Sequence, residues 1–273
     1  MKKPSSRFLL SFVVIVCVVL VGFTFWIRDR YVVPILTYHH VGEYSDKVLA
    51  LNTVSTKSFE FQMDFLRRHG YLVISFDDLV EGIKKGYAFS RNTVVIHFDD
   101  GYEDNYSNAF PILKKYQLPA MVFVVSDKVG TSGFLTWDQM KEMEQNNFLI
   151  GSHTRHHVYL PKVSLEKARD EIEGSKKILE RNLGHSIDYF VYPTGGFSLE
   201  DKEIVKKAGY KAAGTTNRGK DKFNHDLYEL KRIRMNEGDD QFSGIIMWAK
   251  LSGYYNLFRQ SKSGGVSRDM ILK

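Results

Sequence analysis

The sequence has almost no cysteine, since Cys17 is the only one in 273 residues. One cysteine forms no internal disulfide, and Cys17 lies inside an apolar run, so the rest of the chain has no thiolate nucleophile or thiolate metal ligand. With 43% hydrophobic and 14% aromatic residues, the chain also lacks the composition of a disordered protein or of a small disulfide-stapled scaffold. These absences leave one large α/β domain or two small ones.

The chain also has little surplus charge outside its two ends, although the formal net charge is +6. Residues 1–30 contain five Lys and Arg against one Asp, and residues 259–273 contain four against one. Between them, 29 Lys and Arg face 30 Asp and Glu. A near-neutral body argues against binding to a phosphate backbone, so no nucleic-acid partner is expected.

The longest hydrophobic run is Phe8–Ile27, about 20 residues, which is long enough to cross a bilayer as a helix. Lys2, Lys3 and Arg7 precede it, so the positive-inside rule places the N-terminus in the cytoplasm and the rest of the chain across the membrane. A cleaved signal peptide is the alternative, but the run is longer than a usual h-region and no A-x-A-like site follows. A lipoprotein signal at Cys17 lacks the small residues it needs. We expect a single-pass anchor in residues 1–30, a domain in residues 31–258 and a polar basic tail in residues 259–273.

From residue 31 onward, short β-branched runs alternate with stretches whose apolar residues recur about every 3.6 positions. The expected strands are Val32–Tyr38, Leu72–Ser75, Thr93–Phe98, Ala120–Val125, Phe148–Gly151, Ile187–Val191 and Lys211–Gly214. The expected helices are Phe59–Arg68, Phe76–Lys84, Asn105–Tyr116, Trp137–Gln145, Leu165–Leu183 and Glu200–Ala208. This alternation predicts an α/β fold with a parallel sheet closed, or nearly closed, as a barrel.

Two clusters follow predicted strands, at the edge where such folds gather reactive groups. Asp99 and Asp100 come directly after Thr93–Phe98, and a bound cation is the usual remedy for the repulsion between adjacent carboxylates. His153 and His157 follow another strand, and histidines four residues apart can share one face and one metal. Each cluster alone is also compatible with a solvated turn or a polar loop. Together they favour an Asp-His-His metal site that keeps positions open for water.

Two further strand ends carry polar groups. His39 and His40 close the first predicted strand, and an imidazole with a pKa of about 6.5 suits proton transfer at neutral pH. A histidine bonded to backbone is the structural alternative there. Pro193 and Gly195 follow Ile187–Val191 and fix a tight turn that can aim a backbone N–H into a site, although taken alone they indicate only a turn.

The combination of these motifs, in this order and spacing, resembles the polysaccharide deacetylase family, the NodB-homology domain of carbohydrate esterase family 4. The resemblance covers roughly residues 33–235 and is carried by Phe98-Asp99-Asp100-Gly101, by Ser152-His153-Thr154 with His157 and Leu160, and by Tyr192-Pro193 with Gly195. It implies a distorted (β/α) barrel of parallel strands with a divalent metal, zinc being the expected ion. It also implies hydrolysis of N-acetyl groups on amino-sugar polymers.

By motif position, the resemblance implies a role for each site residue. It implies Asp100, His153 and His157 as metal ligands and Asp99 as the general base. It implies that the backbone N–H of Thr194 meets the developing oxyanion, and that Tyr192, Pro193 and Gly195 form a substrate-binding turn.

The sequence departs from the family pattern in two places. Many members have an Arg before the Pro-x-x-Gly turn that orients the catalytic Asp, whereas this chain has Tyr192. Many also carry a C-terminal Leu-x-His motif for the general acid, and the only later histidine here, His225, lacks that context. The early Tyr38-His39 and the later run at residues 230–234 (LKRIR) resemble the branch that acts on poly-N-acetylglucosamine of biofilms. That resemblance implies His39 as general acid, with His40 as its competitor.

The expected function is metal-dependent N-deacetylation of N-acetylglucosamine units in an extracellular or cell-wall polysaccharide. The sequence leaves poly-N-acetylglucosamine and peptidoglycan open as the polymer. A catalytically silent glycan-binding module of the same fold is the alternative, but such a module has no chemical reason to retain Asp99. Hydrolysis of a small amide or cyclic imide conflicts with a membrane anchor, because such substrates are usually met in the cytoplasm.

Overall fold

The computed structural model describes residues 12, 14–19, 21–22, 30–43, 52–216, 218–240, 244–257, 259 and 264–267. The chain divides into two compact units, residues 1–32 and residues 33–273. In the first unit, residues 14–19 and 21–22 are helical. None of the described helices combines the length and the apolar character needed to cross a bilayer. Much of the predicted span Phe8–Ile27 lies outside the described residues.

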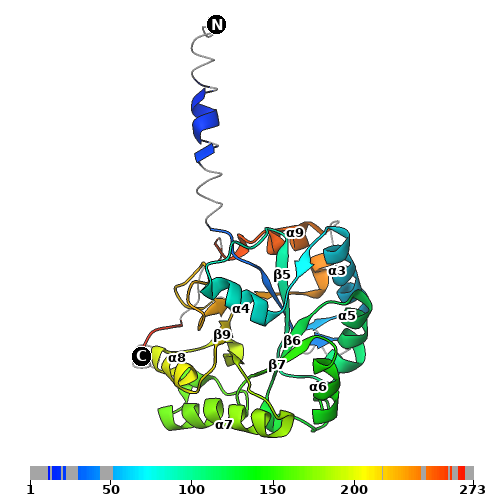
Figure 1. Ribbon diagram of the computed structural model, residues 1–273, viewed down its shortest axis with the longest axis vertical. Coiled ribbons are helices and arrows are strands. Elements are labelled where there is room, and N and C mark those ends of the chain that lie inside the picture. The colour runs from blue at the N-terminus through cyan, green and yellow to red at the C-terminus, as the bar shows by residue number, and fades with distance from the viewer. Residues whose placement is uncertain are drawn as a thin grey trace, which may run out of the picture. The chain divides into compact units, whose positions relative to one another are not determined.

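The second unit alternates strands and helices as the sequence predicts (Figure 1). Its main strands are β1 (Ile35–Tyr38), β4 (Leu72–Val73), β5 (Thr93–Phe98), β6 (Ala120–Val124), β7 (Phe148–Ser152), β8 (Tyr189–Val191), β9 (Ala212–Thr215), β10 (Leu230–Lys231) and β11 (Ile233–Arg234). The helices include α3 (Thr56–Arg68), α4 (Phe76–Lys84), α5 (Phe110–Tyr116), α6 (Trp137–Glu144), α7 (Leu165–Leu183), α8 (Leu199–Lys207) and α9 (Ile245–Leu251). A minor pair joins β2 (His40–Val41) to β3 (Thr53–Val54).

All seven predicted strands and six predicted helices are present, and β5, α4 and α7 have the predicted bounds. The helix predicted at 105–116 begins as a π-helix over Asn105–Ala109 before α5. Serine and threonine side chains define the helix starts, because each accepts a hydrogen bond from the N–H three residues further on. These N-caps are Ser55, Ser75, Thr136, Ser164 and Ser198.

The strands form a parallel sheet in the order β10-β9-β8-β7-β6-β5-β1-β11, with β4 paired to β5. The two ends of this order, β10 and β11, are consecutive in the chain and are separated only by Arg232. The Arg232 N–H donates to the Thr215 carbonyl of β9 at 3.1 Å, and the Met235 N–H donates to the Thr37 carbonyl of β1 at 3.0 Å. One short segment therefore pairs with both edges, which confirms a nearly closed parallel barrel.

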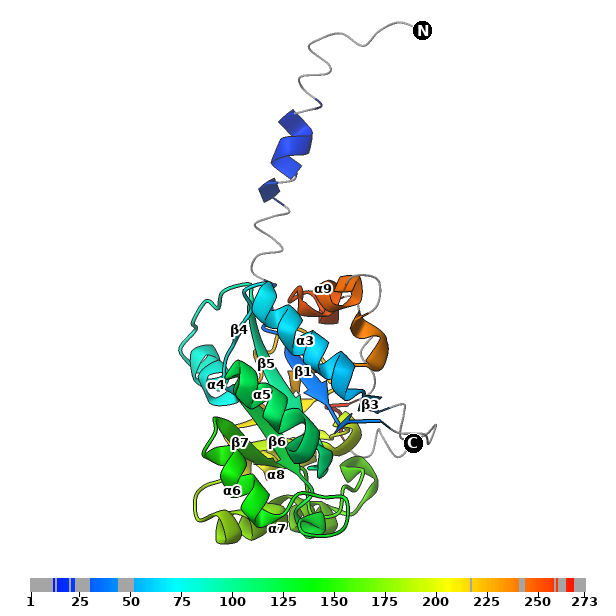
Figure 2. The same ribbon diagram turned by 90° about the vertical axis from the view of Figure 1, so that its right-hand side faces the viewer.

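Alternate residues of β5 face two different cores, as strand geometry requires. Val94, Ile96 and Phe98 belong to the core between the sheet and helices such as α3 and α5. His97 points into the barrel, where its ring packs against Phe76 of α4 and Phe123 of β6. Figures 1 and 2 show helices such as α6, α7 and α8 around the outside of the strands. Asp99 continues the inward series beyond the end of β5, which places it at the mouth of the barrel.

Candidate active site

The carboxyl ends of the strands bring the predicted metal ligands together. Asp100 Oδ1 lies 3.5 Å from His153 Nε2 and 3.3 Å from His157 Nε2. The ligand atoms of the three residues all lie within 4.8 Å of one another. Asp100 and His153 are buried and His157 is half-buried, so one side of the cluster is open to solvent.

The local environment of His153 suits metal binding. Its Nδ1 lies 2.8 Å from the Val191 carbonyl, and a backbone carbonyl can only accept, so Nδ1 carries the proton and Nε2 presents its lone pair to the cluster. Burial lowers the pKa of His153, although the charges of Asp99 and Asp100 partly oppose this. A neutral imidazole is the form that binds metals. The donor set of one carboxylate and two imidazoles therefore fits a divalent cation such as zinc.

The loop that carries both histidines has an unfavourable backbone conformation. Thr154 and His157 have φ angles of +67° and +59°, in the left-handed region, which costs on the order of 1–2 kcal/mol per residue. Within the loop, the His157 N–H donates to Thr154 Oγ1 at 3.0 Å. The neighbouring helix α7 supplies further contacts through Glu171, which hold the loop in this shape.

Glu171 is a buried carboxylate that anchors the histidine loop. Its Oε2 accepts hydrogen bonds from the N–H groups of Arg155 (3.0 Å) and His156 (2.8 Å). Its Oε1 lies 2.7 Å from His156 Nδ1 and 2.9 Å from Lys167 Nζ. Both oxygens are therefore occupied by groups of the loop and of α7. Glu171 belongs to no recognisable sequence motif, and nothing in the sequence shows that its carboxylate is buried against residues 155–156.

Asp99 makes a forked ion pair with Arg232. The two guanidinium nitrogens donate to Asp99 Oδ1 at 2.6 Å and to Oδ2 at 2.8 Å, and both side chains are buried. Burial raises the pKa of Asp99, but the charge of Arg232 and the hydrogen bonds from it more than offset this, so the pKa lies well below its usual range. Asp99 is therefore held ionised and in a fixed orientation.

Arg232 supplies the arginine partner of Asp99, although it does not stand before the Pro-x-x-Gly turn, where the resemblance leads one to expect it. It lies at the seam between β10 and β11, inside the LKRIR run, and its Nε donates to the Thr215 carbonyl at 3.3 Å. Gly214 leaves room for it, since a Cβ there would lie 2.9 Å from Arg232 Cδ. The LKRIR run was the only sequence feature that pointed to this segment. Its pairing with Asp99 could not be predicted, because it depends on closure of the barrel.

The two candidate acids face different surroundings. His39 Nε2 lies 4.0 Å from Asp99 Oδ2, and the His39 side chain is 23% exposed, so it reaches both the site and solvent. Burial lowers the pKa of His39, an effect that Asp99 and Asp100 partly offset. The His40 ring instead stacks on Tyr102, with its Nδ1 2.6 Å from Asp104 Oδ2.

The turn at residues 193–195 lies at the end of β8. Thr194 is exposed and has φ +52°, and the Gly195 N–H donates to the Tyr192 carbonyl at 2.8 Å. The Tyr192 ring is fully buried, and its hydroxyl donates to the Tyr228 carbonyl at 3.0 Å. The Tyr192 side chain is therefore used inside the fold, and the roles of the Thr194 N–H and of Tyr192, Pro193 and Gly195 toward the substrate stay predictions.

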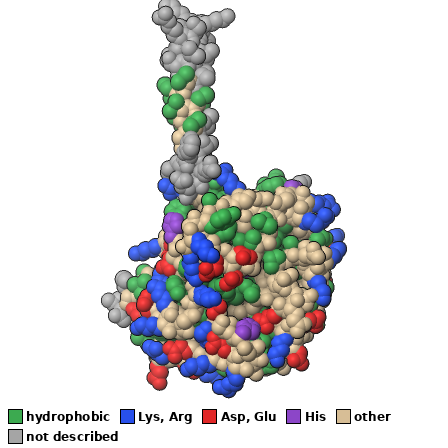
Figure 3. Space-filling view, in the orientation of Figure 1, with side chains coloured by type: hydrophobic (Ala, Val, Ile, Leu, Met, Phe, Trp, Pro, Cys, Tyr) green, Lys and Arg blue, Asp and Glu red, His purple; other side chains and the backbone are tan. Residues whose placement is uncertain are grey.

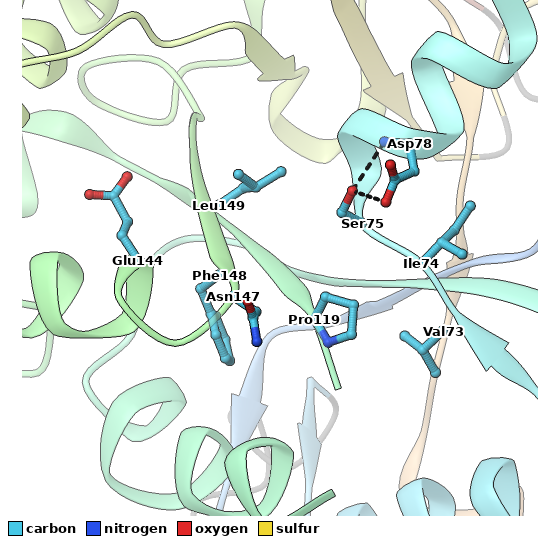
Figure 4. Close-up of a pocket in the computed structure, with 9 residues that line it drawn as sticks. All are labelled: Val73, Ile74, Ser75, Asp78, Pro119, Glu144, Asn147, Phe148 and Leu149. Atoms are coloured by element: carbon cyan, nitrogen blue, oxygen red, sulfur yellow. Dashed lines mark hydrogen bonds between the residues drawn. The ribbon is translucent and has the colours of Figure 1, made fainter. Parts of the chain in front are cut away.

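A cavity of about 440 Å³ lies at the opposite end of the strands. Pro119 and Asn147, which line it, immediately precede β6 and β7, and the close-up also shows Glu144 of α6 (Figure 4). Ser75 and Asp78 line it too, but their polar groups bond to one another as the N-cap of α4. The cavity is therefore separate from the Asp-His-His cluster.

Comparisons with known proteins agree with this fold. Residues 86–213 match the family model described as polysaccharide deacetylase. The poly-beta-1,6-N-acetyl-D-glucosamine N-deacetylase of Staphylococcus aureus (strain MRSA252) is 30% identical over 216 residues, which cover 74% of this chain and 73% of the relative. The Bacillus subtilis (strain 168) protein YxkH, itself named only provisionally as a polysaccharide deacetylase, is 32% identical over 205 residues, 75% of this chain and 72% of that protein.

Solved structures show the same similarity. The Streptococcus pyogenes deacetylase PplD, solved in complex with acetate, is 30% identical with a TM-score of 0.70 over 75% of this chain and 92% of that chain. IcaB from Ammonifex degensii is 25% identical with a TM-score of 0.71 over 81% and 97%. The fold and the site define a (β/α)-barrel hydrolase. The chain belongs to the polysaccharide deacetylase family.

Proposed function

We propose that this protein removes N-acetyl groups from poly-β-1,6-linked N-acetylglucosamine in a metal-dependent hydrolysis. The observation that supports this most is the site itself, where a base held by arginine, an Asp-His-His cluster and a histidine acid meet at one barrel mouth. The names of the Staphylococcus aureus relatives favour this polymer over peptidoglycan.

In this proposal, Asp100, His153 and His157 hold a divalent cation, with zinc as the expected ion. When bound, such a cation acts as a Lewis acid that polarises the amide carbonyl and makes water more acidic. The chain supplies three neighbouring ligand atoms from two loops, and Val191 and Glu171 keep the histidine loop in position.

Asp99 accepts a proton from the attacking water, and Arg232 holds the carboxylate in place for this step. The water oxygen forms a bond to the amide carbon, and the backbone N–H of Thr194 donates to the developing oxyanion. The C–N bond then breaks as His39 donates a proton to the leaving amine. Because His39 Nε2 lies 4.0 Å from Asp99 Oδ2, the proton taken from water has a short path to the acid. The products are acetate and a free amino sugar.

We also propose that Phe8–Ile27 anchors the protein in the cell membrane and that residues 31–258 form the extracytoplasmic catalytic domain. The support is the length of the apolar run and the position of Lys2, Lys3 and Arg7 before it. A polymer outside the cell is then within reach of the enzyme.

Acetate release by the purified full chain from poly-β-1,6-N-acetylglucosamine and from peptidoglycan tests the substrate. We expect release from the first polymer. Release from peptidoglycan alone would contradict the proposed substrate. The absence of release from either, with tight binding to one, would instead indicate the glycan-binding module.

A further inference from the structure

We propose that the catalytic domain rests on the surface of a lipid bilayer through an apolar face formed by Phe61, Leu72, Ile245 and Trp248. This proposal rests on the membrane anchor proposed above. It adds a second contact with the membrane and fixes which end of the barrel faces it.

The four side chains are large, apolar and exposed. Ile245 is 66% exposed, Leu72 56%, Trp248 45% and Phe61 42%. Phe61 and Trp248 pack on the same buried ring, that of Phe65, at 6.4 Å and 5.3 Å, and Leu72 follows Tyr71, whose ring lies 6.1 Å from Trp248. Ile245 and Trp248 are three residues apart on α9, a spacing that places both on one side of the helix.

This apolar face lies toward the end of the barrel where the strands begin. Trp248 packs against His69, which follows α3, and lies 6.1 Å from Tyr71, which precedes β4. Both ribbon views show α9 at that end (Figures 1 and 2). The cluster of Asp100, His153 and His157 lies at the opposite end, after the strands. A bilayer in contact with the apolar face would therefore leave the active site directed away from the membrane.

Basic side chains gather at the same end. Three segments, residues 67–72, 84–92 and 114–119, run from the last turns of α3, α4 and α5 towards the next strands, and we call them the basic connections. They contain seven Lys and Arg and no Asp or Glu. Asp64, Glu81 and Glu60 pair with four of these basic residues, so the seven basic side chains outnumber these three acidic partners. Figure 3 shows hydrophobic side chains with Lys and Arg beside them along the upper edge of the domain. Apolar side chains next to basic ones suit a surface of anionic lipid headgroups.

The length of the chain before the domain favours a bilayer as the occupant. Only residues 28–32 separate the end of the apolar run from Val33, and a chain of this length spans at most about 20 Å when fully extended. Since β1 begins at Ile35, the strands of the barrel start only a short stretch of chain after the proposed anchor. Tryptophan is also enriched at the membrane–water interface. The deacetylated polymer carries amines and would be repelled by the basic connections.

Tryptophan quenching by brominated lipids tests this proposal on the full chain. The chain has three tryptophans, so Trp26→Phe leaves Trp137 at the start of α6 and Trp248 on the apolar face. In vesicles that contain an anionic lipid, we expect brominated acyl chains to quench the emission. When each of the two remaining tryptophans is replaced in this Trp26→Phe chain, the quenching should disappear with Trp248→Phe and persist with Trp137→Phe.

A matched variant controls for general loss of apolar surface. Leu165→Ser with Leu199→Ser changes two side chains that are 48% and 45% exposed at the starts of α7 and α8, and it should leave the quenching unchanged. Ile245→Ser should reduce it. Equal emission with plain and brominated lipids would overturn the proposal. So would a change in Trp248 emission that depends on protein concentration or on added polymer, because the face would then bind a second copy or the polymer. Acetate release in the same vesicles separates the two hypotheses, because its loss with intact quenching counts only against the proposed activity.

Discussion

Arg232 determines how Asp99, the proposed general base, is held. It offers two parallel hydrogen bonds to a carboxylate that is otherwise buried. We predict that Arg232→Gln lowers turnover at least about 10²-fold and destabilises the fold by about 3–5 kcal/mol, because it leaves a buried charge without its partner. Metal content should stay at the parent level. Steady-state kinetics, denaturant unfolding and metal analysis measure these effects.

Arg232→Lys provides the comparison for this prediction. A lysine keeps the positive charge but loses the planar fork, so it should restore part of the stability and less of the turnover. An Arg232→Gln enzyme with parental turnover would show that Asp99 does not depend on this pair.

At His39 and His40, neighbouring residues should respond differently to the same substitution. His39→Gln should lower turnover by about 10² to 10⁴ with metal content unchanged, because it removes the proposed general acid, whose Nε2 lies 4.0 Å from Asp99 Oδ2. His40→Gln should retain turnover and lose stability, because His40 pairs with the buried Asp104. An active His39→Gln with an inactive His40→Gln would reverse the assignment.

At the scale of elements, α7 controls the loop between β7 and α7 through Glu171. A glutamine in its place keeps one acceptor oxygen and presents an NH2 group to donors, so it cannot satisfy the loop amides and Lys167 together. We predict that Glu171→Gln weakens zinc binding by about 10- to 100-fold, as measured by competition with a chelating dye. Glu173→Gln on the same helix, which loses only a pair with Arg169, should bind zinc like the parent.

The same carboxylate makes stability depend on pH. Burial raises the pKa of Glu171, but hydrogen bonds from Lys167 and His156 more than offset this, and the net effect is a lowered pKa. Such a group stabilises the fold above its unfolded pKa of about 4.3, and this contribution is lost as the pH falls through the lower folded value. The free energy of unfolding of Glu171→Gln should therefore change less with pH below about 5 than that of the parent. An identical pH dependence in both proteins would contradict the role of Glu171.

The elements were predictable to the extent that local patterns determine them. β5 and α7 follow from a β-branched run and from apolar spacing with a serine cap and a terminal glycine. β10 and β11 were missed because two-residue strands around Arg232 have too few residues to show alternation. The pairing of Arg232 with Asp99 joins residues 133 positions apart and exists only because the barrel closes. Site residues on strand ends were predictable, and their partners on neighbouring elements were not.

For the whole molecule, the proposed anchor determines where the enzyme is found. We predict that the full chain fractionates with membranes and is cleaved by protease added outside intact cells, because the positive residues before the apolar run keep only the N-terminus inside. Full-length protein in the cytosol, or protected from protease in intact protoplasts, would overturn this topology.

The central claim is that different residues at the mouth of the barrel perform the two tasks: Asp100, His153 and His157 bind the metal, and Asp99 transfers the proton. Metal content and acetate release from poly-β-1,6-N-acetylglucosamine, measured on the same preparations of the parent, Asp99→Asn and Asp100→Ala, test it most directly. We predict that Asp99→Asn retains its metal and loses most turnover, whereas Asp100→Ala loses both, and that a chelator abolishes release by the parent until zinc is restored. Parental acetate release by Asp99→Asn, or by chelator-treated enzyme, would contradict the account.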